Sequence, residues 1–188
     1  MIIDDQIHDV VIIGSGAAGG TMAGELAEAG LKVLLLERGG AMPLADLNVA
    51  DVSLFRQSRY HPEEAWLGTD GDPFSPQMVH ALGGSTKIWG GVLQRMREDD
   101  FRGGPLEEGP GPDWELHYGD LEPWYERAEQ LYRVHGRGGV DPCEPHRGGE
   151  YPFPPKPVEP FQEELRSGLE RLDLHPYCLL YTSDAADE

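Results

Sequence analysis

The sequence predicts an α/β fold built on a parallel sheet, and two observations predict it. A short apolar run, Val10–Ile13, ends on a glycine and is followed by a stretch with helical periodicity. A second apolar run, Val33–Leu36, comes directly after that stretch. Runs that are apolar throughout are typical of parallel strands buried on both faces. The order strand–helix–strand therefore predicts a parallel pair joined by a right-handed crossover.

The turn between the first strand and the helix carries the pattern G-x-G-x-x-G, which is typical of a Rossmann-like dinucleotide site. Gly14 permits the tight turn, Gly16 lets a pyrophosphate approach the backbone, and Gly19 lets the helix pack closely on the strand. The first helical residues, Ala17 and Ala18, offer free N–H groups at the positive end of the helix dipole. The helix is expected to end at a glycine and to present one apolar face, formed by Ala18, Met22, Leu26 and Ala29, before Gly30.

An acidic residue follows the second strand at the spacing that a dinucleotide site requires. Glu37 lies 23 residues after Gly14, where a carboxylate accepts both ribose hydroxyls. The same carboxylate repels the 2′-phosphate of NADP, although the neighbouring Arg38 is a further candidate contact. Strand, glycine turn, helix and acid together favour a dinucleotide site. The alternative is a glycine-rich helix start that binds nothing.

Further along the chain, two more helices are expected. A stretch over 120–134 predicts a helix capped by Asp120, with Pro123 in its first turn and Gly136 after its end. Its apolar positions fall on one face, predicted to be a core face: Leu121, Trp124, Tyr125, Ala128, Leu131 and Tyr132. The last helix has an apolar face of its own: Phe161, Leu165, Leu169 and Leu172. Residues 49–55 form a short helix or a strand, and their sequence does not decide between the two.

The charge of the chain argues against some classes of binding partner. With 34 acidic against 15 basic residues, the formal charge is −19, which repels nucleic acid and anionic lipid. No segment approaches the roughly 20 apolar residues of a membrane span. Asp4 and Asp5 stand where an export signal carries positive charge, so a cytoplasmic location is expected. Cys143 and His146 form a single C-x-x-H, which is half a zinc site at most, so no metal is expected.

The end of the chain has an unusual origin. Residues 178–188 read CLLYTSDAADE, which matches the translated end sequence of a transposon-based sequencing adapter. The adapter begins with one further C, and a codon for Tyr177 ends in C, so the reading frame agrees. A natural acidic tail is the alternative. We therefore expect residues 1–177 to be native and the natural protein to continue beyond them.

A second informative segment spans Val79–Phe101. It contains a Gly-Gly-Ser-Thr loop, then an arginine and an Asp-Phe pair: Gly83, Gly84, Ser85, Thr86, Arg95, Asp100 and Phe101. Paired glycines let backbone approach a flat ligand, and the two hydroxyl residues can open a helix that faces it. Taken alone, this spacing also fits a surface turn. Together with the N-terminal glycine turn, it resembles the glucose–methanol–choline family of FAD oxidoreductases, over nearly all of residues 8–177.

The resemblance implies an incomplete Rossmann-like FAD-binding domain over residues 1–135. Residues 136–177 would then be a Pro/Gly-rich loop and helix that lead into a second, substrate-binding domain. The implied reaction is oxidation of a small alcohol or sugar-like substrate by hydride transfer to FAD, with an electron acceptor that the sequence does not identify. The family's proton-accepting histidine lies near the C-terminus of its members, so this chain is expected to be inactive by itself.

Three residues near the loop bear on what the resemblance implies about the flavin site. Ile88 stands where some relatives carry the histidine that bonds to the flavin, so noncovalent FAD is expected. Trp89 replaces an asparagine found in many members and is a candidate core residue. His80 is a candidate lining residue of the flavin site. Rival interpretations are another Rossmann flavoprotein such as an amine oxidase, an NAD-dependent dehydrogenase, or a nucleotide-binding module without redox chemistry.

The adapter match predicts the result of resequencing. Reading the source locus by a method that does not use this adapter should replace Cys178–Glu188 with a different and longer continuation. Recovery of CLLYTSDAADE followed by a genomic stop codon would show that the tail is natural.

Overall fold

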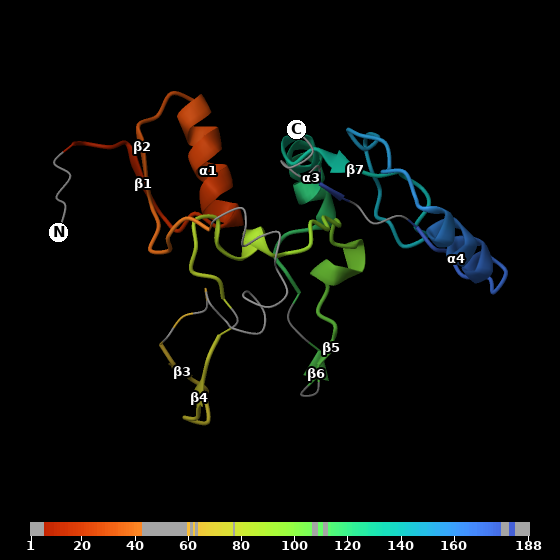
Figure 1. Cartoon of the computed structure of the whole chain (residues 1–188), viewed down its shortest axis with the longest axis horizontal. Helices are drawn as coiled ribbons and strands as arrows, with labels where there is room; N and C mark the ends of the chain where they lie inside the picture. The colour runs from red at the N-terminus through yellow and green to blue at the C-terminus, as the bar shows by residue number, and fades with distance from the viewer. Residues whose placement is uncertain are drawn as a thin grey trace. The chain divides into compact units, whose positions relative to one another are not determined.

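The computed structural model describes residues 6–42, 60, 62, 64–76, 78–106, 109–110, 113–177 and 181–182. The chain divides into two compact units, Met1–Trp89 and Gly90–Glu188, whose elements are labelled in Figure 1. The expected domain boundary at residue 135 concerns the whole protein and stays a prediction. Residues 49–55 lie outside the described residues. None of the helices in the described ranges has the length and apolar character needed to cross a membrane.

The first unit begins with the predicted strand–helix–strand order. β1 (Val10–Ile13) and β2 (Val33–Leu36) pair in parallel, in a register that runs from Val10 opposite Val33 to Ile13 opposite Leu36. Between them lies α1 (Ala17–Glu28), which packs against both strands and stands beside them in Figure 1. The parallel pairing and all three elements are confirmed.

The expected burial of both strand faces is wrong. Ile12 is buried, but Ile13 is 86% exposed and Val11 is 54% exposed. The sheet has two strands in the described part of the chain. A parallel sheet becomes buried on both faces when further strands and a second helical layer cover it. The apolar residues of β1 thus mark a face that the described residues leave open.

In the described ranges, the rest of the first unit contains a hairpin and a short helix. β3 (Trp66–Leu67) and β4 (Pro73–Phe74) pair antiparallel. The rings of Trp66 and Phe74 meet edge to face with centroids 6.4 Å apart, which is a favoured aromatic geometry. The 3₁₀ helix η2 (Gly84–Lys87) follows, and a parallel bridge between Gly40 and Ala81 ties the segment before it to the end of β2.

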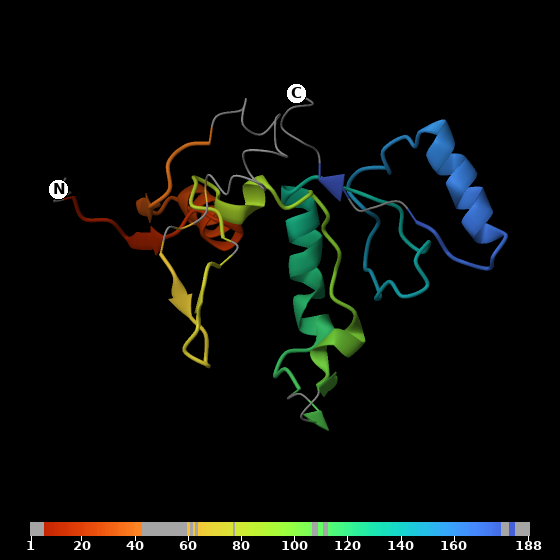
Figure 2. The same ribbon diagram turned by 60° about the horizontal axis from the view of Figure 1, so that its bottom comes forward.

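The second unit contains two longer helices and several two-residue strands. Its elements in chain order are η3 (Glu98–Phe101), β5 (Pro105–Leu106), β6 (Gly109–Pro110), α3 (Tyr118–Leu131), β7 (Val134–His135), α4 (Pro160–Glu170) and β8 (Tyr181–Thr182). The pairs β5–β6 and β7–β8 are antiparallel. β8 lies within the predicted adapter-derived tail. Figure 2 shows α3 and α4 as separate helices joined by a long loop.

The ends of α3 differ from the prediction. The N-cap is His117, and Asp120 accepts the His117 N–H from the third helical position at 2.9 Å. A carboxylate at this position satisfies a free N–H from inside the helix. Because α3 begins two residues early, Pro123 falls in its second turn. At the other end, Arg133 adopts the left-handed conformation, φ 52°, so the helix ends before Gly136.

The predicted core face of α3 is wrong in part. Trp124 is 61% exposed and Leu131 is 48% exposed, whereas Glu129 is buried. The expected face of α4 is also largely open, since Phe161 is 67% exposed and Leu165 is 60% exposed. An apolar stripe shows that a helix needs a partner surface. It does not show that the described residues supply one.

A buried ion network holds α3 in the second unit. Arg95 binds Glu129 through two contacts of 2.8 Å, and Arg147 approaches the same carboxylate at 2.7 Å. The side chains of these three residues are only 2%, 6% and 8% exposed, in the order Arg95, Glu129, Arg147. Burial alone would raise the pKa of Glu129, but hydrogen bonds and charge from both arginines lower it below its usual value. The carboxylate therefore stays ionised, as such a network requires.

Loss of the shared carboxylate should destabilise the protein. Glu129→Ala leaves the buried Arg95 guanidinium without its carboxylate partner and Arg147 with Glu144 alone, so we expect the free energy of unfolding to fall by roughly 3–5 kcal/mol. Glu163→Ala is the matched control because Glu163 pairs with Arg166 at the surface, where their side chains are 46% and 44% exposed and such pairs contribute about 1 kcal/mol or less. Urea unfolding of the complete protein measures both. Equal midpoints for the two variants would contradict the role of the network.

Candidate dinucleotide-binding site

The glycine turn has the geometry that its sequence predicts. Gly14 has φ +95°, in the left-handed region that favours glycine. A Cβ at Gly19 would lie 1.9 Å from the Gly14 carbonyl oxygen, so the helix approaches the turn as closely as glycine permits. A Cβ at Gly16 would meet no atom of the described residues within 4 Å. The turn thus leaves open space above Gly16.

The N-terminus of α1 is available to an anion. Gly16 is its N-cap and makes no side-chain capping bond, and within this fully described helix the first turn contains no acidic residue. Ala17 and Ala18 are exposed and have short side chains. Free N–H groups and the positive end of the helix dipole favour phosphate in such a place. The open space above Gly16 lies at this helix N-terminus.

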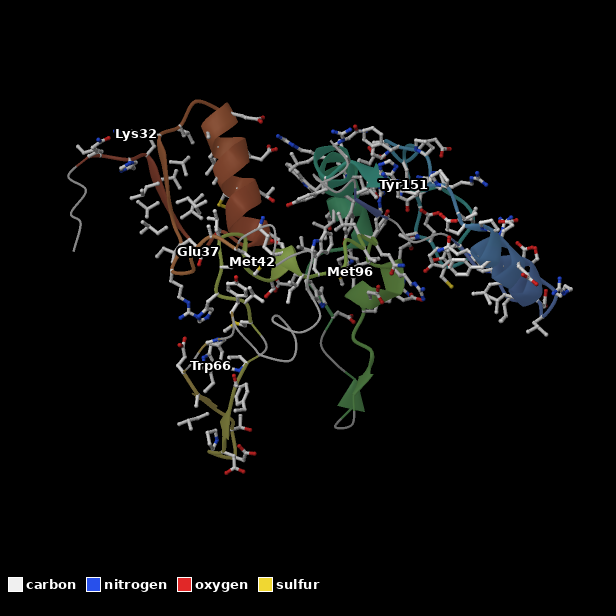
Figure 3. The ribbon with its side chains drawn as sticks, in the orientation of Figure 1. Lys32, Glu37, Met42, Trp66, Met96 and Tyr151 are labelled. Carbon is white, nitrogen blue, oxygen red and sulfur yellow. The ribbon has the colours of Figure 1, made fainter. Side chains whose placement is uncertain are left out.

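Glu37 directly follows β2, as Figure 3 shows, and its carboxylate accepts several hydrogen bonds. Oε1 accepts the Gly39 N–H at 2.8 Å, while Oε2 accepts the N–H and the hydroxyl of Ser15 at 2.8 and 2.7 Å. The backbone of Gly39 first, then the backbone and hydroxyl of Ser15, lower the pKa of Glu37 to about 2. This contribution to stability is present above the ordinary pKa of 4.5 and is lost as the pH falls towards 2.

The hydrogen bonds of Glu37 limit what it can offer a ribose. A carboxylate has about four acceptor positions. Ser15 and Gly39 fill three of them, and a hydrogen bond from the Arg38 backbone also lowers the pKa of this group. Accepting both ribose hydroxyls, as the sequence predicts, therefore requires protein donors to be released or shared.

The Gly-Gly-Ser-Thr loop meets the glycine turn. Gly83 and Gly84 have φ of 92° and 57°, so both occupy the left-handed region. The Gly83 N–H donates to the Ser15 hydroxyl oxygen at 2.9 Å, across 68 residues of sequence. A Cβ at Gly84 would lie 3.6 Å from the Gly16 Cα. Two motifs that are distant in the sequence thus form one continuous backbone surface.

The hydroxyl groups of the loop fix its own backbone. Ser85 Oγ accepts the Val79 N–H at 3.3 Å, and the Thr86 hydroxyl donates to the Gly83 carbonyl oxygen. Both residues lie inside η2, whose N-cap is Gly83 and which has no side-chain capping bond, so the prediction that Ser85 and Thr86 open the helix is wrong. Ile88 is half-buried where η2 ends. Trp89 is 43% exposed, and its candidate role as a core residue is wrong.

Arg38 and His80 lie beside this surface. The Arg38 guanidinium pairs with Glu64 at 2.8 Å and contacts the His80 imidazole. The Arg38 side chain is 59% exposed. The ion pair with Glu64 thus holds the exposed guanidinium of Arg38, which is the residue after Glu37 in the sequence.

The arginine and Asp-Phe positions of the second motif have structural roles in the second unit. Arg95 belongs to the buried network, and Asp100 accepts the Arg97 N–H at 2.7 Å to cap η3. Phe101 is 3% exposed and packs edge to face on Trp114, with ring centroids 6.0 Å apart. In the ranges that the structure describes, no group of three or more potential metal ligands is present.

The chain is similar to several known proteins. The family model described as pyridine nucleotide-disulphide oxidoreductase matches residues 8–98, which include both glycine segments and Glu37. The 6'''-hydroxyparomomycin C oxidase of Streptomyces lividus is 35% identical over 92% of this chain and 31% of its own length. An oxygen-dependent choline dehydrogenase of Rhizobium johnstonii is 31% identical over 75% of this chain and 26% of its own length.

These relatives match most of the chain, including the segments that carry the glycine turn and the later loop. The chain belongs to the glucose–methanol–choline family of FAD oxidoreductases. The crystal structure of pyridoxine 4-oxidase from Mesorbium loti shares the fold, with a TM-score of 0.51 at 23% identity over 88% of this chain and 32% of that one. This family member therefore spans between a quarter and a third of the length of the relatives named here.

Sequence reasoning missed one residue of the site in this glucose–methanol–choline family member. Ser15 is 8% exposed and contacts both Glu37 and Gly83. It occupies a variable position of G-x-G-x-x-G, where the pattern assigns no role. The sequence does place a hydroxyl residue between two glycines. Its partner Gly83 lies 68 residues further along the chain, so no local pattern could identify this contact.

Replacement of Glu37 should weaken FAD binding by the complete protein. A hydrogen bond to a charged group contributes about 1.5–3 kcal/mol, so Glu37→Ala should lower the affinity for FAD roughly ten- to a hundredfold. Glu28→Ala, an exposed acid at the end of α1, is the control and should bind as the parent does. Titration of the apoprotein with FAD, followed by flavin fluorescence, measures both variants. Unchanged affinity for Glu37→Ala would remove Glu37 from the site.

Proposed function

We propose that the complete protein containing this chain is an FAD-dependent oxidoreductase that oxidises an alcohol carbon. The observation that carries the proposal is the joined backbone surface of Gly16 and Gly84, with the ionised Glu37 beside it. Two relatives support the reaction class by name, as a 6'''-hydroxyparomomycin C oxidase and an oxygen-dependent choline dehydrogenase. A small alcohol or a sugar-like molecule is the proposed substrate, and we assign no electron acceptor.

The proposed work of this chain is to bind and orient the cofactor. Backbone N–H groups at the start of α1 would hold the pyrophosphate, and Glu37 would accept a ribose hydroxyl. The Gly83–Thr86 loop would lie against the flavin end of the cofactor. The proposed binding residues are Gly14, Gly16, Ala17, Ala18, Gly19, Glu37, Arg38, Gly83, Gly84, Ser85 and Thr86. Once bound, FAD supplies the capacity to take up a hydride from the alcohol carbon.

We assign no catalytic residue to this chain. The two long-range contacts of the site, Ser15 with Glu37 and Ser15 with Gly83, use groups that position rather than react. A group that accepts the alcohol proton would have to come from elsewhere in the complete protein.

A visible absorption spectrum tests the proposal against its rivals. The purified complete protein should show the yellow bands of a flavin, and an oxidisable alcohol should bleach them in the absence of oxygen. A flavin that is bleached by amines and by no alcohol indicates an amine oxidase. A colourless protein that binds NAD, or a nucleotide without any redox change, overturns the proposal.

FAD should be held without a covalent bond at Ile88. An isoleucine side chain has no nucleophile with which to bond the flavin, so acid precipitation should release the yellow colour into the supernatant. Colour that remains in the washed pellet shows covalent attachment at another residue.

A further inference from the structure

We propose that Ser15 is a positioning residue for FAD, whose hydroxyl connects the Glu37 carboxylate to the Gly83–Gly84 loop. This inference rests on the proposed function, because it concerns the same FAD site. The G-x-G-x-x-G pattern assigns no role to this residue, which occupies one of its variable positions. Its role would be to hold the two glycine segments and the ribose-binding acid in one arrangement.

The Ser15 hydroxyl donates one hydrogen bond and accepts another. A serine hydroxyl has one hydrogen to donate and lone pairs to accept with. The hydrogen goes to Glu37 Oε2 at 2.7 Å, and the oxygen accepts the Gly83 N–H at 2.9 Å. The Ser15 backbone N–H adds a third contact, 2.8 Å from the same Oε2. A residue that is 8% exposed thus joins segments 22 and 68 residues away.

These contacts determine how the Glu37 carboxylate is oriented. Ser15 bonds Oε2 twice and Gly39 bonds Oε1, so the rotation of the carboxylate is fixed. Without the hydroxyl, Oε2 loses one donor and the carboxylate is freer to rotate. A ligand hydroxyl would then meet an acceptor whose direction is no longer fixed, which lowers the gain from preorganisation.

The Ser15 hydroxyl also binds the Gly83–Gly84 loop, where the backbone has the most conformational freedom. Gly83 and Gly84 both have positive φ, and glycine loses more conformational freedom on ordering than any other residue. Removing the acceptor leaves the partly buried Gly83 N–H without a partner, which is unfavourable. Gly84 lies close to Gly16 in this arrangement. A looser loop would therefore disturb the backbone surface on which FAD is proposed to lie.

The rest of the unit does not depend on this hydroxyl. The segment before the loop is held separately by the parallel bridge between Gly40 and Ala81 and by the Leu82 N–H, which donates to the Gly40 carbonyl oxygen at 2.8 Å. The pairing of β1 with β2 is independent of it as well. Loss of the Ser15 hydroxyl should thus affect the site while the fold remains.

A double-mutant cycle in the complete protein tests the proposal. The variants are Ser15→Ala, Glu37→Ala and the two combined, with FAD affinity measured by titration of each apoprotein. We expect Ser15→Ala to weaken FAD about tenfold, the loss that corresponds to one hydrogen bond to a charged group. Because Ser15 acts partly through Glu37 and partly through the Gly83 loop, the loss of affinity in the combined variant should be smaller than the product of the two separate losses, since coupled residues are not additive.

Controls separate positioning from a general effect on folding. Thr21→Ala removes a hydroxyl from α1 that donates to the Ala17 carbonyl oxygen; it should leave FAD affinity unchanged. The melting temperature of apo Ser15→Ala should stay near that of the parent. If this variant fails to fold, Ser15→Thr and Ser15→Val provide a pair of equal shape that differs in the hydroxyl, and the threonine variant should bind FAD more tightly.

Each other outcome overturns the proposal in a distinguishable way. Unchanged or tighter FAD binding by Ser15→Ala, or additive losses in the cycle, would show that Ser15 does not position Glu37 while leaving the FAD site intact. A parent protein that binds no FAD overturns the proposed function and this inference with it.

Discussion

The first unit depends on the carboxylate of Glu37 and the donors that surround it. Three hydrogen bonds from Ser15 and Gly39 reach this group, and through the Ser15 hydroxyl the Gly83 loop is joined to it. A partly buried carboxylate with several donors is stable only in its ionised form, which is why its pKa lies so low. One charge thereby fixes the end of β2 relative to both glycine segments, and the relative placement of these three parts is what a dinucleotide requires.

The elements β1, α1 and β2 could be predicted from sequence because the signals for them are local, whereas the β3–β4 hairpin was not predicted. The apolar runs gave β1 and β2, the glycine spacing gave the start of α1, and the parallel register follows from their connection. Burial could not be predicted in the same way. Ile13 is apolar and lies in a strand, yet it is largely exposed. Whether a side chain is covered depends on segments elsewhere in the chain, which the local pattern does not contain.

The difference between local patterns and contacts that are distant in the sequence also explains the errors in the second unit and at the site. Asp120 was recognised as a capping residue, but its position within the helix depends on where His117 begins it. Glu129 reads as a surface residue of α3 until Arg95 and Arg147, 34 and 18 residues away, are brought to it. At the site, the spacing predicted Glu37 directly, and the family resemblance supplied the Gly83–Thr86 loop. Ser15 was missed because its contact with Gly83 exists only in three dimensions.

The buried network of α3 has a consequence for the behaviour of the protein in heat. Two guanidinium groups, of Arg95 and Arg147, face the carboxylates of Glu129 and Glu144, so opposite charges are balanced in number. The penalty for removing charged groups from water decreases as temperature rises, because their hydration carries a strongly negative entropy. Apolar packing does not gain in the same way. The second unit thus contains a stabilising element whose relative weight increases on warming, an arrangement of the kind that thermophilic proteins use repeatedly.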